Sequence, residues 1–225
     1  MERKIFKHEL YPKIELGEIT KEGQRVYTTP TGERYESVTT VLGKFSDKTA
    51  LENWRKRVGY AEALKITKAA ANRGTKLHKI CENYLLNVED YEGGATEFDR
   101  MMFAAIKPVY DHAIDIVYGI EYPLYSHELQ TAGRTDIWAR FDGVSSIVDN
   151  KSSTKLKKRA WIRNYFLQAT TYALMVRERL GVDVPQIVIV ISSEDSNIPQ
   201  VFVERTAKYE AEARAIFEAN KTMKA

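Results

Sequence analysis

Hydrophobic and polar positions follow strand-like patterns at the start of the second half of the chain, over 117–128, 131–142 and 145–152. The apolar residues from Ile162 to Leu180 then have the spacing of an amphipathic helix, which ends at Gly181, a residue typical of helix C-termini. The apolar segment PQIVIVISS predicts a strand inside a sheet, PQVFVER predicts another strand, and 207–220 predicts a closing helix. This β-β-β-α-β-β-α order indicates an α/β fold with a central mixed β-sheet flanked by helices.

The first half of the chain begins with short strands and continues as helices. RVYTT and ERYESVTTVL are rich in β-branched and aromatic residues, and they predict two strands separated by a turn. From Asp47 the pattern is helical. It predicts a helix capped by Asp47, a second over 61–86 that breaks near Gly74, and a third over 97–116 that is kinked by Pro108.

The composition is that of an ordinary folded protein. With 225 residues, 44% hydrophobic and 29% charged, we expect a single domain over 1–225. Within it, 1–116 forms a mainly helical N-terminal portion and 117–225 forms the core. Cys81 is the only cysteine, which excludes an intrachain disulfide and a cysteine-ligated iron–sulfur cluster.

The chain lacks the features of a membrane or secreted protein. It has no run of 18 apolar residues, and its N-terminus has no apolar segment typical of a signal peptide. We therefore expect no membrane partner and a cytoplasmic location.

Charge is unevenly distributed although the formal net charge is only +3. Residues 54–79 carry eight lysines or arginines against the single acid Glu62, and 151–163 carry six with no acid. Such segments can follow a phosphate backbone, or they can be solvated helix faces, and charge alone leaves both interpretations open.

Asp136, Asp149 and Lys151 form the most informative constellation. Residues two apart on a strand share a face, so Asp149 and Lys151 point the same way. If Asp142-Gly143 forms a two-residue turn, counting back along both strands places Asp136 opposite Asp149. A four-residue loop would keep the three residues together, whereas a three-residue loop would place Asp136 on the other face.

Two adjacent carboxylates repel each other unless a cation neutralises them. Oxygen ligands suit Mg²⁺ or Mn²⁺, and a lysine on the same face can orient an attacking water. The three residues therefore indicate metal-assisted phosphodiester hydrolysis. The alternative is a cross-strand ion pair beside an unrelated aspartate.

The segment 133–151, with Asp136 followed by Asp149-Asn150-Lys151, resembles the core of the PD-(D/E)XK nucleases. Gln168 and Tyr172 are similar to the Q-x-x-x-Y motif of the RecB-like branch of that superfamily. ANRGTKLHKICENYL resembles the helix that supplies a histidine ligand in this branch, here His78, and Glu121 matches a frequent acidic position. ESVTTVL and LENWRKRVG also look like phage exonucleases related to the mitochondrial genome maintenance exonuclease. This resemblance implies that the cytoplasm is that of a bacterium or a phage-infected host cell.

The resemblance implies a restriction-endonuclease-like core and a role for each matching residue. The metal ligands would be His78, Asp136, Asp149 and the backbone carbonyl of Asn150, whose side chain turns away. Lys151 would position the attacking water or stabilise the developing charge. Gln168 would hold Lys151 or the water, and Tyr172 would support the site or touch DNA. Asn150 departs from the pattern, since relatives often have an apolar residue there.

Several further residues are candidates for supporting or binding roles. Glu82 and Glu121 would support the ligands without binding the ion. Trp54 and Trp138 are predicted to lie in the core, whereas Trp161 could stack on unpaired bases. The candidate DNA contacts are Thr39, Thr40, Arg73, Lys155, Lys157, Lys158 and Trp161.

These features together predict a Mg²⁺- or Mn²⁺-dependent deoxyribonuclease, with one or two ions and most simply an exonuclease of recombination, repair or DNA degradation. Its partner would be DNA, as single strands or duplex ends, together with a single-strand annealing or replication protein. The alternatives are a structure-selective endonuclease and a non-catalytic nucleic-acid-binding subunit with a nuclease fold.

Overall fold

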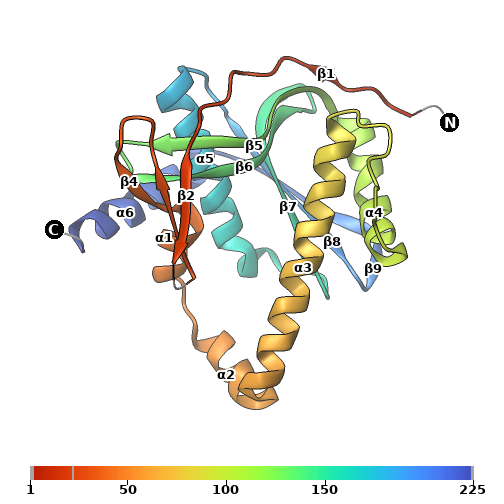
Figure 1. Ribbon diagram of the computed structural model, residues 1–225, viewed down its shortest axis with the longest axis horizontal. Helices are drawn as coiled ribbons and strands as arrows, with labels where there is room; N and C mark the ends of the chain where they lie inside the picture. The colour runs from red at the N-terminus through yellow and green to blue at the C-terminus, as the bar shows by residue number, and fades with distance from the viewer. Residues whose placement is uncertain (1–2, 22, 224–225) are drawn as a thin grey trace.

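The computed structural model describes residues 3–21 and 23–223, and the strands within them form one nine-stranded mixed sheet (Figure 1). The order is β2-β3-β4-β6-β7-β8-β9, and β5 pairs with both β6 and β1. The strands are β1 (Lys7–His8), β2 (Gly17–Lys21), β3 (Gln24–Thr28), β4 (Arg34–Ser37), β5 (Ile114–Ser126), β6 (Thr131–Phe141), β7 (Val144–Ser153), β8 (Gln186–Ser193) and β9 (Ser196–Arg205).

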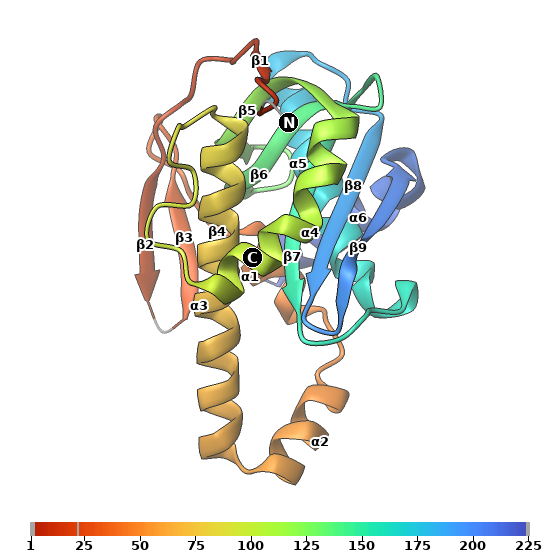
Figure 2. The ribbon, with the colours of Figure 1, turned by 90° about the vertical axis from the view of Figure 1, so that its right-hand side faces the viewer.

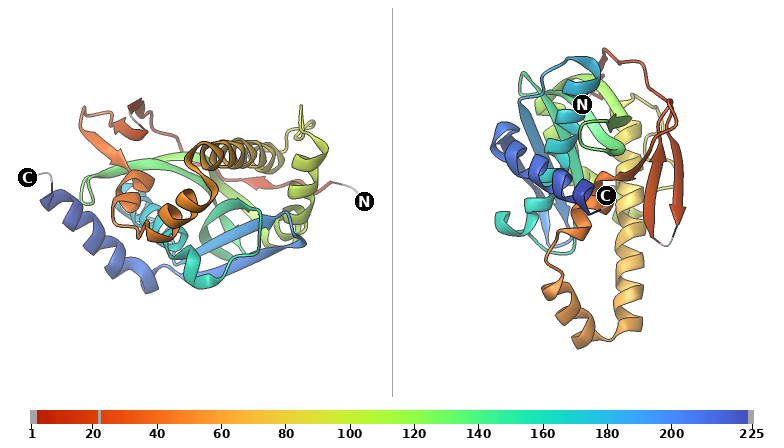
Figure 3. Two further views of the ribbon diagram at one scale, coloured as in Figure 1. Left: turned by 90° about the horizontal axis from the view of Figure 1, so that it is seen from below. Right: turned by 90° about the vertical axis from the view of Figure 1, so that its left-hand side faces the viewer.

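Helices cover both faces of this sheet (Figure 3). Alternate residues of β8 divide between the two sides, with Ile187 and Ile189 in one core and Val188 and Val190 in the other. Helices α1, α5 and α6 pack on the first side, and α3 and α4 on the second. The helices are α1 (Val38–Lys44), α2 (Thr49–Val58), α3 (Tyr60–Leu85), α4 (Glu97–Ala113), α5 (Arg163–Leu180) and α6 (Ala207–Thr222), with the short 3-10 helix η1 (Arg159–Ile162) before α5.

The predictions for the second half of the chain are confirmed. Strands β5 to β9 and helices α5 and α6 occur in the expected order, which gives the predicted mixed sheet with flanking helices. Asp142 and Gly143 both have positive φ, and Phe141 pairs directly with Val144 across a two-residue turn. The turn sets the register, and Ile137 with Val148 is the paired position farthest from the turn. Asp136 lies one residue beyond that pair, on the side away from the turn.

The prediction of a strand over ERYESVTTVL is wrong beyond Ser37. The hydroxyl of Ser37 accepts a hydrogen bond from the backbone N–H of Thr40, and this N-cap starts α1 at Val38. Valine and threonine favour strands, but here Val38 and Val41 fill a hydrophobic core from a helix. The N-cap and the tertiary packing therefore override the local strand preference.

The predicted break near Gly74 is absent, and Pro108 lies inside helix α4 without interrupting it. Helix α3 is continuous through Gly74, where an added Cβ would make only ordinary contact, 3.6 Å from Oγ of Ser152. Helix α4 contains Pro108 and starts with a capping box between Thr96 and Asp99. The prediction that Asp47 caps helix α2 is wrong, because the N-cap is Lys48, although the Asp47 carboxylate accepts the N–H of Thr49, the first residue of the helix.

Helix α2 and the N-terminal half of α3 project from the body as a helical arm (Figure 2). No residue of α2 is buried, so the prediction that Trp54 belongs to the core is wrong, whereas Trp138 is buried as expected. Tyr60 and Leu64 are 68% and 70% exposed near the end of the arm. Within the described part of the chain, every helix is too short or too polar to cross a membrane.

Candidate active site

The site is built on strand β6. Strand β5 pairs along one edge of β6, and two other strands share the opposite edge. On that shared edge β4 reaches only Thr131 and Ala132, while β7 starts at Ile137. Residues 133–136 therefore pair with neither β4 nor β7 on this edge. A pocket of about 1120 Å³ opens beside them. Asp136, the last of these residues, lines this pocket.

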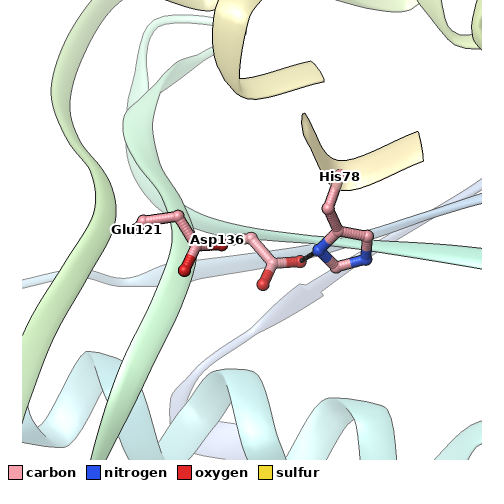
Figure 4. A group of neighbouring side chains, drawn as sticks. All are labelled: His78, Glu121 and Asp136. Carbon is pink, nitrogen blue, oxygen red and sulfur yellow. Dashed lines mark ion pairs between the residues drawn. The ribbon is translucent and has the colours of Figure 1, made fainter. Parts of the chain in front are cut away.

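His78, Glu121 and Asp136 meet in this pocket from three separate segments of the chain (Figure 4). The β5–β6 register places Glu121 directly opposite Asp136, and α3 supplies His78 from above the sheet. The Nδ1 atom of His78 lies 3.4 Å from Oδ2 of Asp136. One nitrogen or oxygen of each residue lies within 4.8 Å of the others. Opposite ligands of a Mg²⁺ ion are about 4.2 Å apart, so a small inward adjustment would let all three bind one cation.

Glu121 adopts an unusual backbone conformation. Its φ is +44°, in the left-handed region that residues with side chains rarely occupy. Such conformations cost about 1–3 kcal/mol and occur most often at functional sites. Burial raises the pKa of Glu121, and the charge of Asp136 raises it further. Glu121 was predicted to support the ligands, but the structure places it with His78 and Asp136 as a direct candidate ligand.

The charges of His78 and Asp136 stabilise each other. Burial lowers the pKa of His78, but the charge of Asp136 and the hydrogen bond between them outweigh this effect and raise it to about 9. Burial raises the pKa of Asp136, but the same imidazole brings it below the ordinary value. The carboxylate of Asp136 therefore favours a proton on His78, and a bound cation would compete with that proton.

Asp149 and Lys151 form an ion pair at the end of β7 that is close to this cluster. The Nζ atom of Lys151 lies 2.6 Å from Oδ2 of Asp149 and donates a hydrogen bond of 2.8 Å to its Oδ1. Burial raises the pKa of Asp149 to about 6, and the charge of Asp136 contributes in the same direction. The amide of Gln168 donates to Oδ1 of Asp149 at 3.1 Å. Gln168 was predicted to hold Lys151 or a water, whereas in the structure it holds the partner of Lys151.

Asn150 contacts the site through its backbone and not through its side chain. Its backbone N–H donates to Oδ2 of Asp136 at 2.9 Å, where the β6–β7 ladder has ended. Its side chain lies on the other face and accepts a 2.6 Å hydrogen bond from Tyr110. The prediction that the side chain of Asn150 turns away from the site is confirmed. The buried hydrogen bond explains how this position tolerates a polar residue.

The remaining predicted residues divide between the pocket and other surfaces. Tyr172, Thr39 and Glu82 line the pocket. Arg73 pairs instead with Glu194 at 3.1 Å. Five others lie outside the pocket lining: Thr40, Lys155, Lys157, Lys158 and Trp161. Among these, Trp161 is 64% exposed and has Nζ of Lys158 5.3 Å from the centre of its ring.

Four basic residues of the pocket were not predicted as site residues: Lys13, Arg25, Lys79 and Arg134. Lys13 and Arg25 come from the N-terminal segment and β3, and no local pattern connects them with the site. Arg134 could have been found, because it stands two residues before Asp136 on the same strand and so shares its face.

The donor set fits a hard divalent cation. Carboxylate oxygens are the ligands preferred by Mg²⁺ and Mn²⁺, and an imidazole can complete the set for a transition metal. Three carboxylates are candidate ligands here, those of Glu121, Asp136 and Asp149, and the Nδ1 atom of His78 lies beside that of Asp136.

No family model matches the chain, and no curated protein matches it. What the site does is therefore inferred from its own residues.

Proposed function

We propose that the protein is a divalent-cation-dependent deoxyribonuclease with a restriction-endonuclease-like core of the RecB-like type, acting as an exonuclease. One observation carries the proposal: residues from separate segments converge on one pocket, in the combination that such a nuclease needs. They are His78, Glu121, Asp136, Lys151, Gln168 and Tyr172, with Asp149 paired to Lys151.

His78, Glu121 and Asp136 would hold the cation, together with Asp149 and the carbonyl of Asn150. A bound Mg²⁺ or Mn²⁺ would polarise a phosphoryl oxygen and make water a better nucleophile at neutral pH. Asp136 is held for this role by the backbone N–H of Asn150, which donates to it across the end of the ladder.

Lys151 supplies a fixed positive charge beside the carboxylates. Burial lowers its pKa, but the charges of Asp149 and Asp136 outweigh burial and raise it, so the ammonium stays protonated. A buried cation can orient an attacking water and stabilise negative charge that develops on the phosphate. Gln168 holds Asp149 and thereby keeps the Asp149–Lys151 pair in place.

The projecting arm suits a nucleic-acid substrate. Lys56, Arg57, Lys65 and Lys68 are exposed on it, and exposed basic residues bind phosphates without sequence preference. An arm beside the site would favour DNA that enters by an end. With in-line attack and departure of the 3′ oxygen, the products would carry 5′-phosphates.

The test uses end-labelled linear DNA, single-stranded and duplex, beside covalently closed single-stranded circles, with Mg²⁺, Mn²⁺ or EDTA. Metal-dependent loss of the linear DNA alone is expected, and the order of product release gives the polarity. Cleavage of circles would move the assignment to an endonuclease. Binding without cleavage under all metal conditions would contradict the nuclease proposal and favour a binding subunit.

A further inference from the structure

Arg134 has no role in the site as described so far, although it lies within it. It lines the same pocket as Asp136, on the same face of β6. Residues two apart on a strand are separated by about 6.6 Å, so the side chain of Arg134 starts close to Asp136 and the other candidate cation ligands. Its side chain is exposed, and therefore accessible to a ligand in the pocket.

The other basic side chains of the pocket are already engaged. Arg25 pairs with Glu18 at 3.2 Å, and Lys79 pairs with Glu82 at 3.1 Å. The ammonium of Lys13 donates to the backbone carbonyl of Ile120 at 2.6 Å. Lys151 pairs with Asp149. Each of these charged side chains therefore already interacts with an oxygen atom of the protein.

Arg134 differs from them. In the part of the chain that the structure describes, no hydrogen bond or ion pair joins its guanidinium to another residue. Its charge acts to lower the pKa values of Glu121 and Tyr27, so the guanidinium lies between the candidate cation ligands and strand β3. Glu121 is near enough to feel the charge but makes no ion pair with it, so the guanidinium keeps its donors for a ligand.

We infer that Arg134 binds a phosphate of the substrate and so aligns the DNA strand with the cation site. A guanidinium presents a planar fork of donors that matches two phosphate oxygens. The phosphate would be either a phosphodiester next to the scissile bond or a phosphomonoester at the strand end. The identification of DNA as the ligand rests on the proposed function, whereas the binding of a phosphate by Arg134 does not.

The experiment measures binding of a labelled oligonucleotide in Ca²⁺, with a gel to verify that the DNA stays intact. Wild type is compared with Arg134→Ala, Arg134→Lys and the control Arg140→Ala. Arg140 is an arginine of the same strand that pairs with Asp115 and does not line the pocket. We expect Arg134→Ala to weaken binding about tenfold and to reduce the salt slope of log K by about 0.7–0.9. Arg134→Lys should recover part of the affinity, and Arg140→Ala should behave like wild type.

Oligonucleotides with and without terminal phosphates separate the two sources. A loss confined to phosphorylated ends assigns Arg134 to a terminal phosphate, and a loss with both assigns it to an internal phosphodiester. Equal affinities and slopes for Arg134→Ala and Arg140→Ala would overturn the inference, even if the wild type cleaves DNA. Weakened binding by Arg134→Ala in a protein that never cleaves would instead contradict the nuclease proposal alone.

Discussion

The Nδ1 atom of His78 on helix α3 lies 3.4 Å from Oδ2 of Asp136 on strand β6. This contact joins the helical N-terminal portion to the core sheet at the point where the β6–β7 ladder ends. The charge of Asp136 and its hydrogen bond to the imidazole raise the pKa of His78 to about 9, against the effect of burial. A divalent cation would compete with the proton on the imidazole.

Cation binding should therefore depend on pH. Because the pKa of His78 is about 9, a cation must displace a proton at any lower pH. Above about pH 7, where Asp149 with its pKa of about 6 is ionised, affinity for Mn²⁺ is expected to rise about tenfold per pH unit until about pH 9. Calorimetry in two buffers of different ionisation enthalpy should show release of about one proton. His78→Asn should bind more weakly with a flatter pH profile, and a pH-independent affinity of the wild type would contradict this account.

Lys151→Ala should separate cation binding from catalysis. Removing one charged group that stabilises a transition state typically costs about 10²–10³ in rate, so single-turnover cleavage should fall by that factor. Mn²⁺ binding should persist, because His78, Glu121 and Asp136 are unchanged. Lys7→Ala is the matched control, because Lys7 is an exposed lysine that pairs with Glu9 outside the pocket, and this variant should stay near the wild-type rate. Unchanged cleavage by Lys151→Ala would remove this residue from the mechanism.

Gly133→Ala should destabilise the protein at the floor of the pocket. An added Cβ would lie 2.6 Å from Oη and 3.0 Å from Cε1 of Tyr172, too close for either atom. Forcing the ring aside typically costs about 1–3 kcal/mol, which urea unfolding can measure. Gly43→Ala is the control, because nothing lies within 4 Å of its added Cβ and alanine suits a helix. Equal stability of the two variants would show that Tyr172 moves freely.

Tyr110 and Asn150 should behave as a coupled pair in stability measurements. Tyr110→Phe leaves the buried amide oxygen of Asn150 without its 2.6 Å donor, at a cost of about 1–3 kcal/mol. Asn150→Leu combined with Tyr110→Phe should recover much of this loss, because both polar partners are then gone. Tyr60→Phe, at a 68% exposed tyrosine, should change stability little. Additive effects of the two substitutions would contradict the coupling.

Local signals were sufficient for much of the core. The turn at Asp142-Gly143 could be predicted because its positive φ values depend on those two residues alone, and it sets the distance between Asp136 and Asp149. The alternation along β7 likewise separates Asn150 from its neighbours.

Long-range packing accounts for what the sequence did not indicate. The strand predicted beyond Ser37 is a helix whose Val38 and Val41 are buried against distant elements, and this packing overrides their strand propensity. Glu121 becomes a candidate ligand only through the β5–β6 register and its φ of +44°, which no local pattern specifies. Similarly, the need for glycine at position 133 arises from Tyr172, which approaches it from a distant helix.

The most direct test compares wild type with a variant that carries alanine at Asp136, Asp149 and Lys151. Both are mixed in excess with end-labelled linear DNA in Mn²⁺, in Mg²⁺ and in EDTA, after melting curves establish that both are folded. We expect the wild type to shorten the DNA only when metal is present, and the variant to leave it intact. Cleavage by the variant at the wild-type rate would contradict the assignment of this pocket as the active site of a nuclease.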